Sequence, residues 1–320
     1  KLLYEVAIGL LSGIGNMLTK QLVSYCGSAE AVFKTSKGKL LKIPGIGECL
    51  AKVIINQNVL KLAEEEIKFA SKYDIELIFY THPRYTKRLK QIIDAPELIY
   101  FKGNTNLDNT KVISIIGTRQ ATEYGKRIVN ELIEGLKQFN TLVVSGLAYG
   151  IDITAHRRAL HHNLSTVGVM ASGIDIIYPS VHRNTVVKML ENGGILTEYP
   201  FGKKPDAPHF PTRNRIIAGL ADCVIVIEAG KRGGALITAE IANSYNRDVF
   251  AVPGNIGEKF SEGCNNLIKS HRANLLTSIE DIKYVMNWVT KQGKLSSGHS
   301  NNRDKGTNDQ SYSFDISKLT

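Results

Sequence analysis

Six apolar segments between residues 112 and 254 decide the fold: VISIIG (112–117), TLVVSG (141–146), STVGVMASG (165–173), GILTEYP (194–200), DCVIVIEAG (222–230) and DVFAVPG (248–254). They are short and rich in Val and Ile, as strands buried on both faces are. The predicted helices between them cover residues 123–138, 152–162, 182–192, 213–219 and 235–246. This alternation predicts an α/β fold with an extended Rossmann-like parallel sheet of about six strands, whose ligands bind at the carboxyl ends of the strands.

Four parts of the chain are distinguished by composition. Residues 1–70 have the pattern of short helices with paired glycines, which predicts a small all-α helix-hairpin-helix (SAM-like) domain. Residues 71–110 mix short strands with a broken helix, and we expect a connector packed on the core. The Rossmann-like domain spans residues 111–290, and residues 291–320 are so polar that a disordered tail is expected.

The charge balance favours an anionic partner. Lys and Arg number 40 against 30 Asp and Glu, which gives a formal net charge of +10. The four cysteines form no C-x-x-C pair, so neither a zinc site nor a redox centre is expected. No apolar run reaches the ~20 residues that cross a bilayer, and no signal-peptide cleavage site follows the apolar start. We therefore expect a cytoplasmic protein without a metal or cofactor.

The first 70 residues contain two glycine hairpins. KIPGIGE (42–48) matches the helix-hairpin-helix pattern, and LSGIGN (11–16) is a weaker copy. Gly45 and Gly47 would allow a phosphate to approach the free N–H groups of the next helix. Glu48 at the tip opposes this, so a purely structural hairpin remains an alternative.

Four strand-to-helix junctions of the core carry residues suited to binding phosphate. They combine glycines with hydroxyl groups or cations, which hold an anion through backbone N–H groups and charge. The third junction, after ASGID (171–175), leads to Tyr178. The residues selected at the other three are Gly117, Thr118 and Arg119; Ser145, Gly146 and Gly150; and Lys231, Arg232, Gly233 and Gly234.

Further candidates lie beside these junctions. Arg213 and Arg215 are two residues apart on a predicted helix, so they point in different directions; one is expected to bind DNA and the other to hold neighbouring loops. Tyr149 and Tyr178 are candidates for stacking on bases. His156 is interpreted as a structural histidine rather than a catalyst.

Several motifs resemble the DNA-processing protein A (DprA/Smf) family and occur in its order. They are GTRQATEYG (117–125), SGLAYGIDITAH (145–156), GIDIIYP (173–179), FPTRNRIIAGL (210–220), EAGKRGGALITA (228–239), and VFAVPGNIGE with GCNNLI (249–268). Together they span more than half of the chain.

The resemblance implies a homodimeric, non-enzymatic protein that binds single-stranded DNA in a basic pocket. It further implies that the protein protects incoming DNA and loads the RecA recombinase during natural transformation. The pocket would be lined by the junction residues named above with Arg213 and Arg215, and the dimer surface would lie near Leu267, Ile268 and Leu275. His182 stands where the family usually has Asn, and Gly233-Gly234 replaces its usual Ser-Gly.

Two other classes of function remain as alternatives. A nucleotide-processing enzyme of the lysine-decarboxylase-like (LOG) type shares the sheet topology, and Gly233, Gly234 and Glu240 fit the spacing of its signature. However, Leu236 and Ile237 replace the Gly-Thr of that signature. A scaffold that binds only proteins has no need of several anion sites. We therefore predict that successive phosphates lie at the helix starts near Gly117, Gly146 and Gly230.

Overall fold

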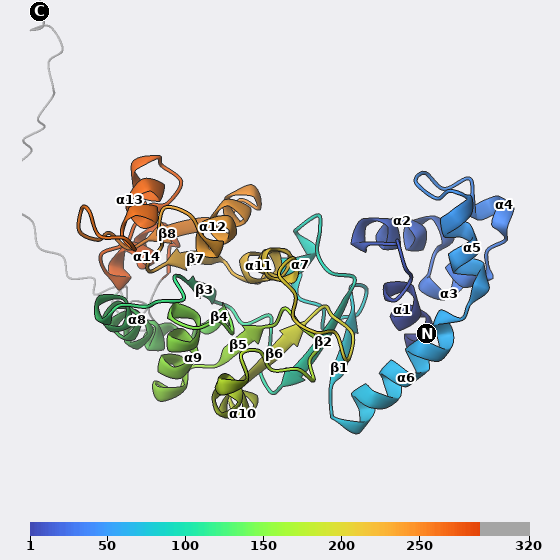
Figure 1. Ribbon diagram of the computed structural model, residues 1–320, viewed down its shortest axis with the longest axis horizontal. Coiled ribbons are helices and arrows are strands. Elements are labelled where there is room, and N and C mark those ends of the chain that lie inside the picture. Colours follow the sequence, from blue (N-terminus) through green and yellow to red (C-terminus); the bar gives the residue numbers. More distant parts are fainter. Residues whose placement is uncertain (289–320) are drawn as a thin grey trace, which may run out of the picture.

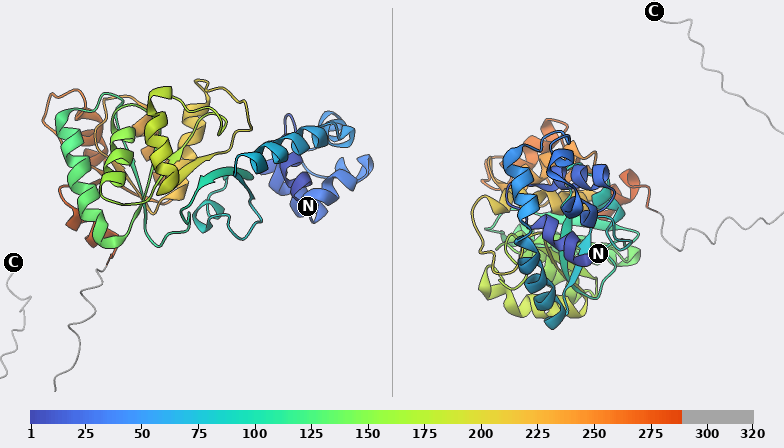
Figure 2. Two further views of the ribbon diagram at one scale, coloured as in Figure 1. Left: turned by 90° about the horizontal axis from the view of Figure 1, so that it is seen from below. Right: turned by 90° about the vertical axis from the view of Figure 1, so that its right-hand side faces the viewer.

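The computed structural model describes residues 1–288. Figure 1 shows one long sheet with helices above and below it, and a separate helical unit at one end. Figure 2 shows the same elongated arrangement from two further directions. The α/β class predicted from the sequence is confirmed. The predicted disordered tail, residues 291–320, lies outside the described residues.

Nine strands form a single sheet in the order β1-β2-β6-β5-β4-β3-β7-β8-β9. The strands from β6 to β9 along this order are parallel, whereas β1 and β2 pair antiparallel at one edge. The strand bounds are β1 Glu76–Phe79, β2 Leu98–Gly103, β3 Val112–Ile116, β4 Leu142–Gly146, β5 Thr166–Val169, β6 Gly193–Thr197, β7 Cys223–Val226, β8 Asp248–Ala251 and β9 Asn274–Leu275.

The sheet is thus larger than the sequence predicts. The six apolar segments form β3 to β8, and every residue of β3 is buried, as expected for a central parallel strand. The additional strands are β1 and β2, from the segment expected to be a connector, and the two-residue β9. Short strands were expected in that segment, but not that β2 joins the main sheet, because its partner β6 is distant in the sequence.

Helices cover both faces of the sheet. One face packs against α11 (His209–Leu220), α12 (Gly234–Ser244) and α13 (Glu262–Lys269), which share a hydrophobic cluster with the strands. The other face packs against α8 (Glu123–Leu136), α9 (Ile151–His161) and α14 (Ile279–Val285). The remaining elements of this part are α7 (Lys87–Lys90), η1 (Lys137–Phe139), η2 (Ser180–His182) and α10 (Arg183–Glu191).

The N-terminal unit is wholly helical. Its core continues into the edge of the sheet, because side chains of β1 and β2 belong to the same hydrophobic cluster. The unit is therefore packed on the sheet rather than tethered to it. Its helices are α1 (Leu2–Gly9), α2 (Asn16–Cys26), α3 (Ala29–Lys34), α4 (Lys37–Leu40), α5 (Glu48–Asn56) and α6 (Val59–Lys72).

The strand order places a crevice at one point of the sheet. From β3 the chain proceeds to β4, β5 and β6 on one side, and then returns to β7 and β8 on the other side. At the carboxyl ends of β3 and β7, the two following loops therefore lead away from each other. In open α/β sheets, ligands bind at this kind of topological switch point.

Candidate nucleic-acid interface

A groove of about 920 Å³ lies at the switch point, between the loops that follow β3 and β7. Its walls include the predicted residues Gly117, Thr118 and Arg119 on one side and Gly230 to Gly234 on the other. The start of α11 closes one end with Arg213 and Asn214. The sequence prediction that these loops share one edge of the sheet is confirmed by their positions.

The groove is lined mainly by positive charge. Arg119, Lys231, Arg232 and Lys259 are all exposed and line it, and the acidic side chains among its lining residues are Asp152, which is buried, and Glu262. Lys259 was not among the predicted residues, because it lies in the long loop between β8 and α13, outside the four glycine-containing junctions. The four cations make the groove suited to a polyanion.

The start of α12 offers backbone donors to this groove. Gly233 is its N-cap and has no side chain to bond the first amides. Within the described residues, the backbone hydrogen bonds outside helices and strands include none donated by the amides of Gly234 and Ala235. A helix start of this kind, beside Lys231 and Arg232, is an anion site through its free N–H groups and its dipole.

The start of α9, in contrast, is occupied by the protein itself. The Ile151 amide donates to the carbonyl of Thr118 at 3.1 Å. The Ala148 amide bonds the buried carboxylate of Asp152. Gly150 has φ +77, and a Cβ there would lie 2.2 Å from the Thr118 carbonyl oxygen. This junction holds the β3 loop against α9, and the predicted second phosphate site is not available at these amides.

Ser145 and Gly146 are the last two residues of β4. Ser145 is fully buried and its hydroxyl donates to the Ile115 carbonyl at 2.6 Å, so the expectation that it faces the DNA is corrected. A Cβ on Gly146 would lie 2.5 Å from the Asp152 carboxylate and 2.7 Å from the Arg213 guanidinium. Glycine is therefore needed here to make room for these two groups.

Arg213 is buried but lines the groove, and its guanidinium donates to the Val169 carbonyl. Burial raises the pKa of Asp152 to about 6, while the charge of Arg213 acts in the opposite direction. Arg213 thus brings a fixed positive charge to the floor of the groove.

Arg215 points the other way, into the protein. It pairs with Glu198 and is buried with it. With the Asn16 amide of α2 turned so that its oxygen faces Arg215, this oxygen accepts a hydrogen bond from the same guanidinium at 2.9 Å. Of the two arginines, Arg213 is therefore the one placed for a ligand, and the prediction that Arg215 lines the pocket is corrected. They are two positions apart in the sequence, so α11 presents them on opposite sides.

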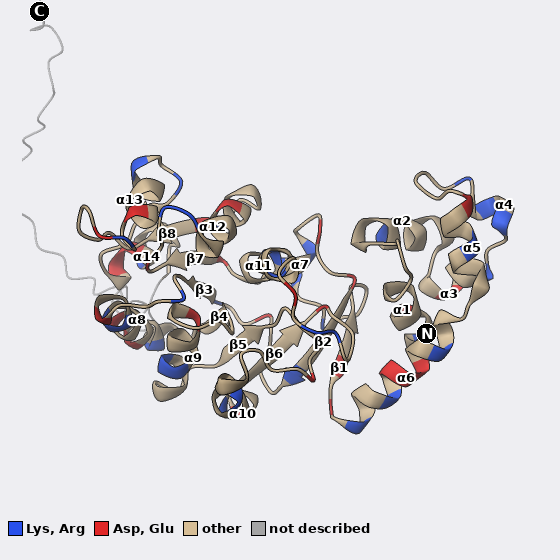
Figure 3. Cartoon of the chain, in the orientation of Figure 1, with Lys and Arg blue, Asp and Glu red and all other residues tan. Residues whose placement is uncertain are grey.

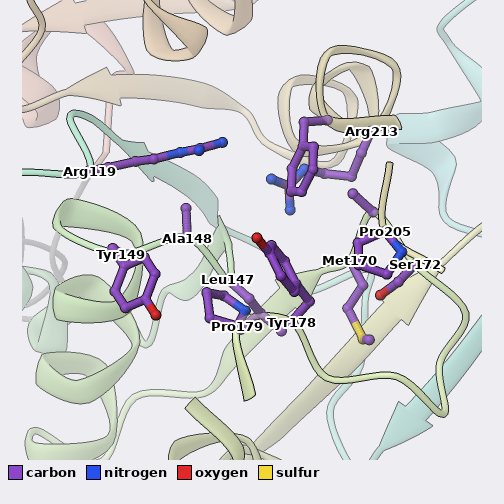
Figure 4. A pocket seen from close by; sticks show the side chains of 12 residues that line it. Arg119, Leu147, Ala148, Tyr149, Met170, Ser172, Tyr178, Pro179, Pro205 and Arg213 are labelled. Carbon is purple, nitrogen blue, oxygen red and sulfur yellow. The ribbon is translucent and has the colours of Figure 1, made fainter. Parts of the chain in front are cut away.

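An aromatic pocket adjoins the groove (Figure 4). Arg119 and Arg213 enter it from opposite sides, with Tyr178 between and below them, and Tyr149 lies beside α9. Phe210 also lines it, and the Arg119 guanidinium lies 5.5 Å from the centre of the Phe210 ring. Phe210 was missed as a site residue, although it stands in the same motif as Arg213. Rings beside guanidinium groups provide surfaces on which bases stack.

His156 has a structural role, as interpreted from the sequence. It is fully buried, and its two ring nitrogens lie 2.7 Å from the Gly146 carbonyl oxygen and 2.7 Å from Thr166 Oγ1. Burial lowers its pKa to about 4. The neutral ring holds β4 and β5 together beneath the pocket.

The two N-terminal hairpins have the same geometry. Gly13 and Gly45 have φ of 78° and 81°, and Gly15 and Gly47 are the N-caps of α2 and α5. Each hairpin packs on the helix that follows the other: Gly13 faces Leu50, and Gly45 faces Leu18. Glu48 pairs with Lys37 at 2.6 Å. The weaker copy is thus a structural repeat, and phosphate contact at Gly45 and Gly47 stays a prediction.

The residues predicted for a dimer surface differ in accessibility. Leu267 is in the core at 2% exposure, Ile268 is half-buried, and Leu275 on β9 is 49% exposed. Of the three, only Leu275 and part of Ile268 are accessible to a second chain.

Glu240 lies away from the groove. It pairs with Arg272 at 3.1 Å and is not among the residues that line the switch-point groove. The glutamate of a LOG-type signature is therefore not placed to act on a ligand there. Residues 1–288 contain no helix long and apolar enough to span a bilayer, and no cluster of three metal-ligating side chains within that range.

Comparison with known proteins gives consistent matches. The model of the DNA recombination-mediator protein A family matches residues 76–287. Protein Smf of Synechocystis is 35% identical over 273 residues, which cover 83% of this chain and 68% of that protein. DNA processing protein DprA of Streptococcus pneumoniae is 41% identical over 198 residues, covering 62% and 70%.

Solved structures agree with these matches. The X-ray structure of DNA processing protein A from Streptococcus pneumoniae superposes with a TM-score of 0.78 at 33% identity, covering 88% of this chain and 97% of that one. DNA processing protein A from Helicobacter pylori, reported for its single-stranded DNA binding mode, gives a TM-score of 0.60 at 29% identity, with 67% and 95% covered.

Proposed function

Since the chain belongs to the DNA recombination-mediator protein A family, we propose that it binds single-stranded DNA in the switch-point groove and passes the strand to the RecA recombinase. The observation that carries this proposal is the convergence of Arg119, Lys231 and Arg232 on one groove. These side chains come from loops more than a hundred residues apart in the sequence. Cations gathered in this way contact phosphates without reading sequence.

The aromatic pocket supports a preference for single strands. Tyr149, Tyr178 and Phe210 line it next to Arg119. A base can reach such rings only when it is unpaired, whereas the bases of a duplex are stacked on one another. A flexible strand can therefore place phosphates in the groove and a base in the pocket together.

The biological setting is part of the same proposal. The protein acts in the cytoplasm, protects DNA that enters during natural transformation, and loads RecA without catalysing a reaction itself. A homodimer would bring two grooves to one strand and raise affinity through effective concentration. Leu275, the most exposed of the predicted dimer residues, is the position at which substitution should first weaken such a dimer.

A salt titration with single-stranded and duplex DNA of the same sequence tests the binding step. The affinity for the single strand should be higher at every salt concentration, and it should fall linearly with the logarithm of salt concentration. Equal binding of both forms would contradict the proposed pocket. RecA loading is tested by filament assembly on a strand already coated with single-strand-binding protein. The LOG-type alternative predicts release of free base from nucleoside monophosphates, which we expect not to occur.

A further inference from the structure

We infer that a bound strand leaves the aromatic pocket past Tyr149 and crosses the adjacent surface of α9 and α10, where Arg157 and Arg183 contact its phosphates. We call this surface, defined by the exposed Arg157 and Arg183, the α9–α10 shoulder. The inference rests on the proposed function, because it extends the path of the same strand.

The mouth of the pocket is continuous with the shoulder. Tyr149 and Tyr178 are 51% and 52% exposed, so both rings reach the surface where the pocket opens. The Tyr149 ring packs edge-on against the ring of His182, with 5.1 Å between centroids. His182 ends η2, and Arg183 begins α10 as the next residue. A strand that stacks a base at Tyr149 therefore has Arg183 among the next side chains it meets.

Arg157 joins the two helices of the shoulder. It belongs to α9, and its Nε donates to Thr185 Oγ1 on α10 at 3.4 Å. Its charge also acts on His182, where it adds to the effect of burial in lowering the pKa of that ring. Figure 3 marks basic residues in blue on both α9 and α10. Both arginines thus lie near His182, whose ring packs against Tyr149.

The charges of the shoulder are not neutralised by carboxylates. Within residues 1–288, neither Arg157 nor Arg183 is in an ion pair. On the neighbouring α8, in contrast, Arg127 pairs with Glu131 at 3.0 Å. The acidic residue of α10, Glu191, is at the far end of the helix, about 12 Å from its start at 1.5 Å per residue. Exposed arginines without an acidic partner keep their positive charge available to phosphates.

His182 has a positioning role in this arrangement. It is 2% exposed, and neither of its ring nitrogens has a hydrogen-bond partner in the described residues. It therefore does not reach a phosphate. Its ring supports Tyr149 at the point where the pocket and the shoulder meet.

Two oligothymidines of different length distinguish binding at the shoulder from binding in the pocket. One has about 6 nucleotides, which is enough for the groove and pocket; the other has about 30, which is well beyond the usual size of a single site. The variant is Arg157→Gln with Arg183→Gln in the full chain. We expect unchanged affinity for the short strand. For the long strand we expect a severalfold loss and a salt slope lower by about 1.4, because each single-strand phosphate contact contributes about 0.7.

Arg158→Gln with Lys188→Gln is the matched control. It also removes two exposed positive charges from α9 and α10, but the charge of Arg158 acts on His162, whose ring lies 3.3 Å from the Asn130 side chain of α8. Equal long-strand losses in both double variants would overturn the inference, since general charge would then explain them. The inference would also be overturned if Arg157→Gln with Arg183→Gln left long-strand binding unchanged, or weakened binding of both strands equally. If the unmodified protein binds neither oligothymidine, the proposed function itself fails.

Discussion

The carboxylate of Asp152 and the guanidinium of Arg213 converge on the same point, above Gly146, where a Cβ would lie 2.5 Å from one and 2.7 Å from the other. One comes from the start of α9 and the other from α11, on the opposite face of the sheet. The floor of the groove therefore holds a buried carboxylate and a buried guanidinium side by side.

Asp152 makes stability depend on pH. Burial raises its pKa from 3.8 to about 6 in the folded chain, so the unfolded chain loses this proton first. The contribution of Asp152 to stability is fully present below about pH 4 and is lost as the pH rises through about 6. Urea unfolding from pH 4 to 7 should show this decline in the unmodified chain, relative to Asp152→Asn. Parallel curves for the two proteins would show that the carboxyl group has an ordinary pKa.

Arg119→Ala should weaken binding to every single strand and lower the salt slope by about 0.7, because one single-strand phosphate contact is lost. Fluorescence anisotropy at several salt concentrations measures both quantities. Arg127→Ala removes an exposed arginine from α8, where it already pairs with Glu131, and should change neither. An unaltered slope for Arg119→Ala would remove this residue from the groove.

Gly234 allows a test of the amide site at the start of α12. Gly234→Pro removes one N–H at the first helical position, where proline is tolerated. Gly234→Ala keeps the N–H, and its Cβ would lie 3.8 Å from the nearest atom, on Asn214. We expect the proline variant to bind single strands severalfold more weakly than the alanine variant. The same affinity in both would mean that this amide donates to no phosphate.

Phe210→Ala should weaken single-strand binding, by about 1 to 3 kcal/mol if one base stacks on the ring. The specific measurement is a comparison with an abasic strand of the same length. Because an abasic site has no base to stack, the difference between the unmodified protein and the variant should then disappear. A loss that persists on the abasic strand would assign Phe210 to the support of Arg119 instead.

Arg215→Ala should reduce stability far more than Arg119→Ala. It leaves the buried carboxylate of Glu198 without its partner, and breaking a buried pair in this way costs about 3 to 5 kcal/mol. Denaturant unfolding of the two variants makes the comparison. Equal stabilities would mean that the Glu198 pair contributes little, contrary to its burial.

Much of this protein could be predicted from local sequence. The strands β3 to β8 and the helices between them were recognised because a two-sided burial pattern and helical periodicity are written into consecutive residues. The loops with Arg119 and with Lys231 and Arg232 were found for the same reason, since each follows a strand directly.

Tertiary structure alone decided which way individual side chains point and what they meet. Ser145 bonds to Ile115 on the neighbouring strand, Arg215 pairs with Glu198, and Phe210 lines the pocket. These outcomes depend on partners brought together by folding, such as Ile115 for Ser145. The sequence by itself determined the layers and the loops that bear charge, because both depend on neighbouring residues. Packing between distant segments determined which charges reach the groove, because burying a charged side chain is costly unless a partner from another element pairs with it.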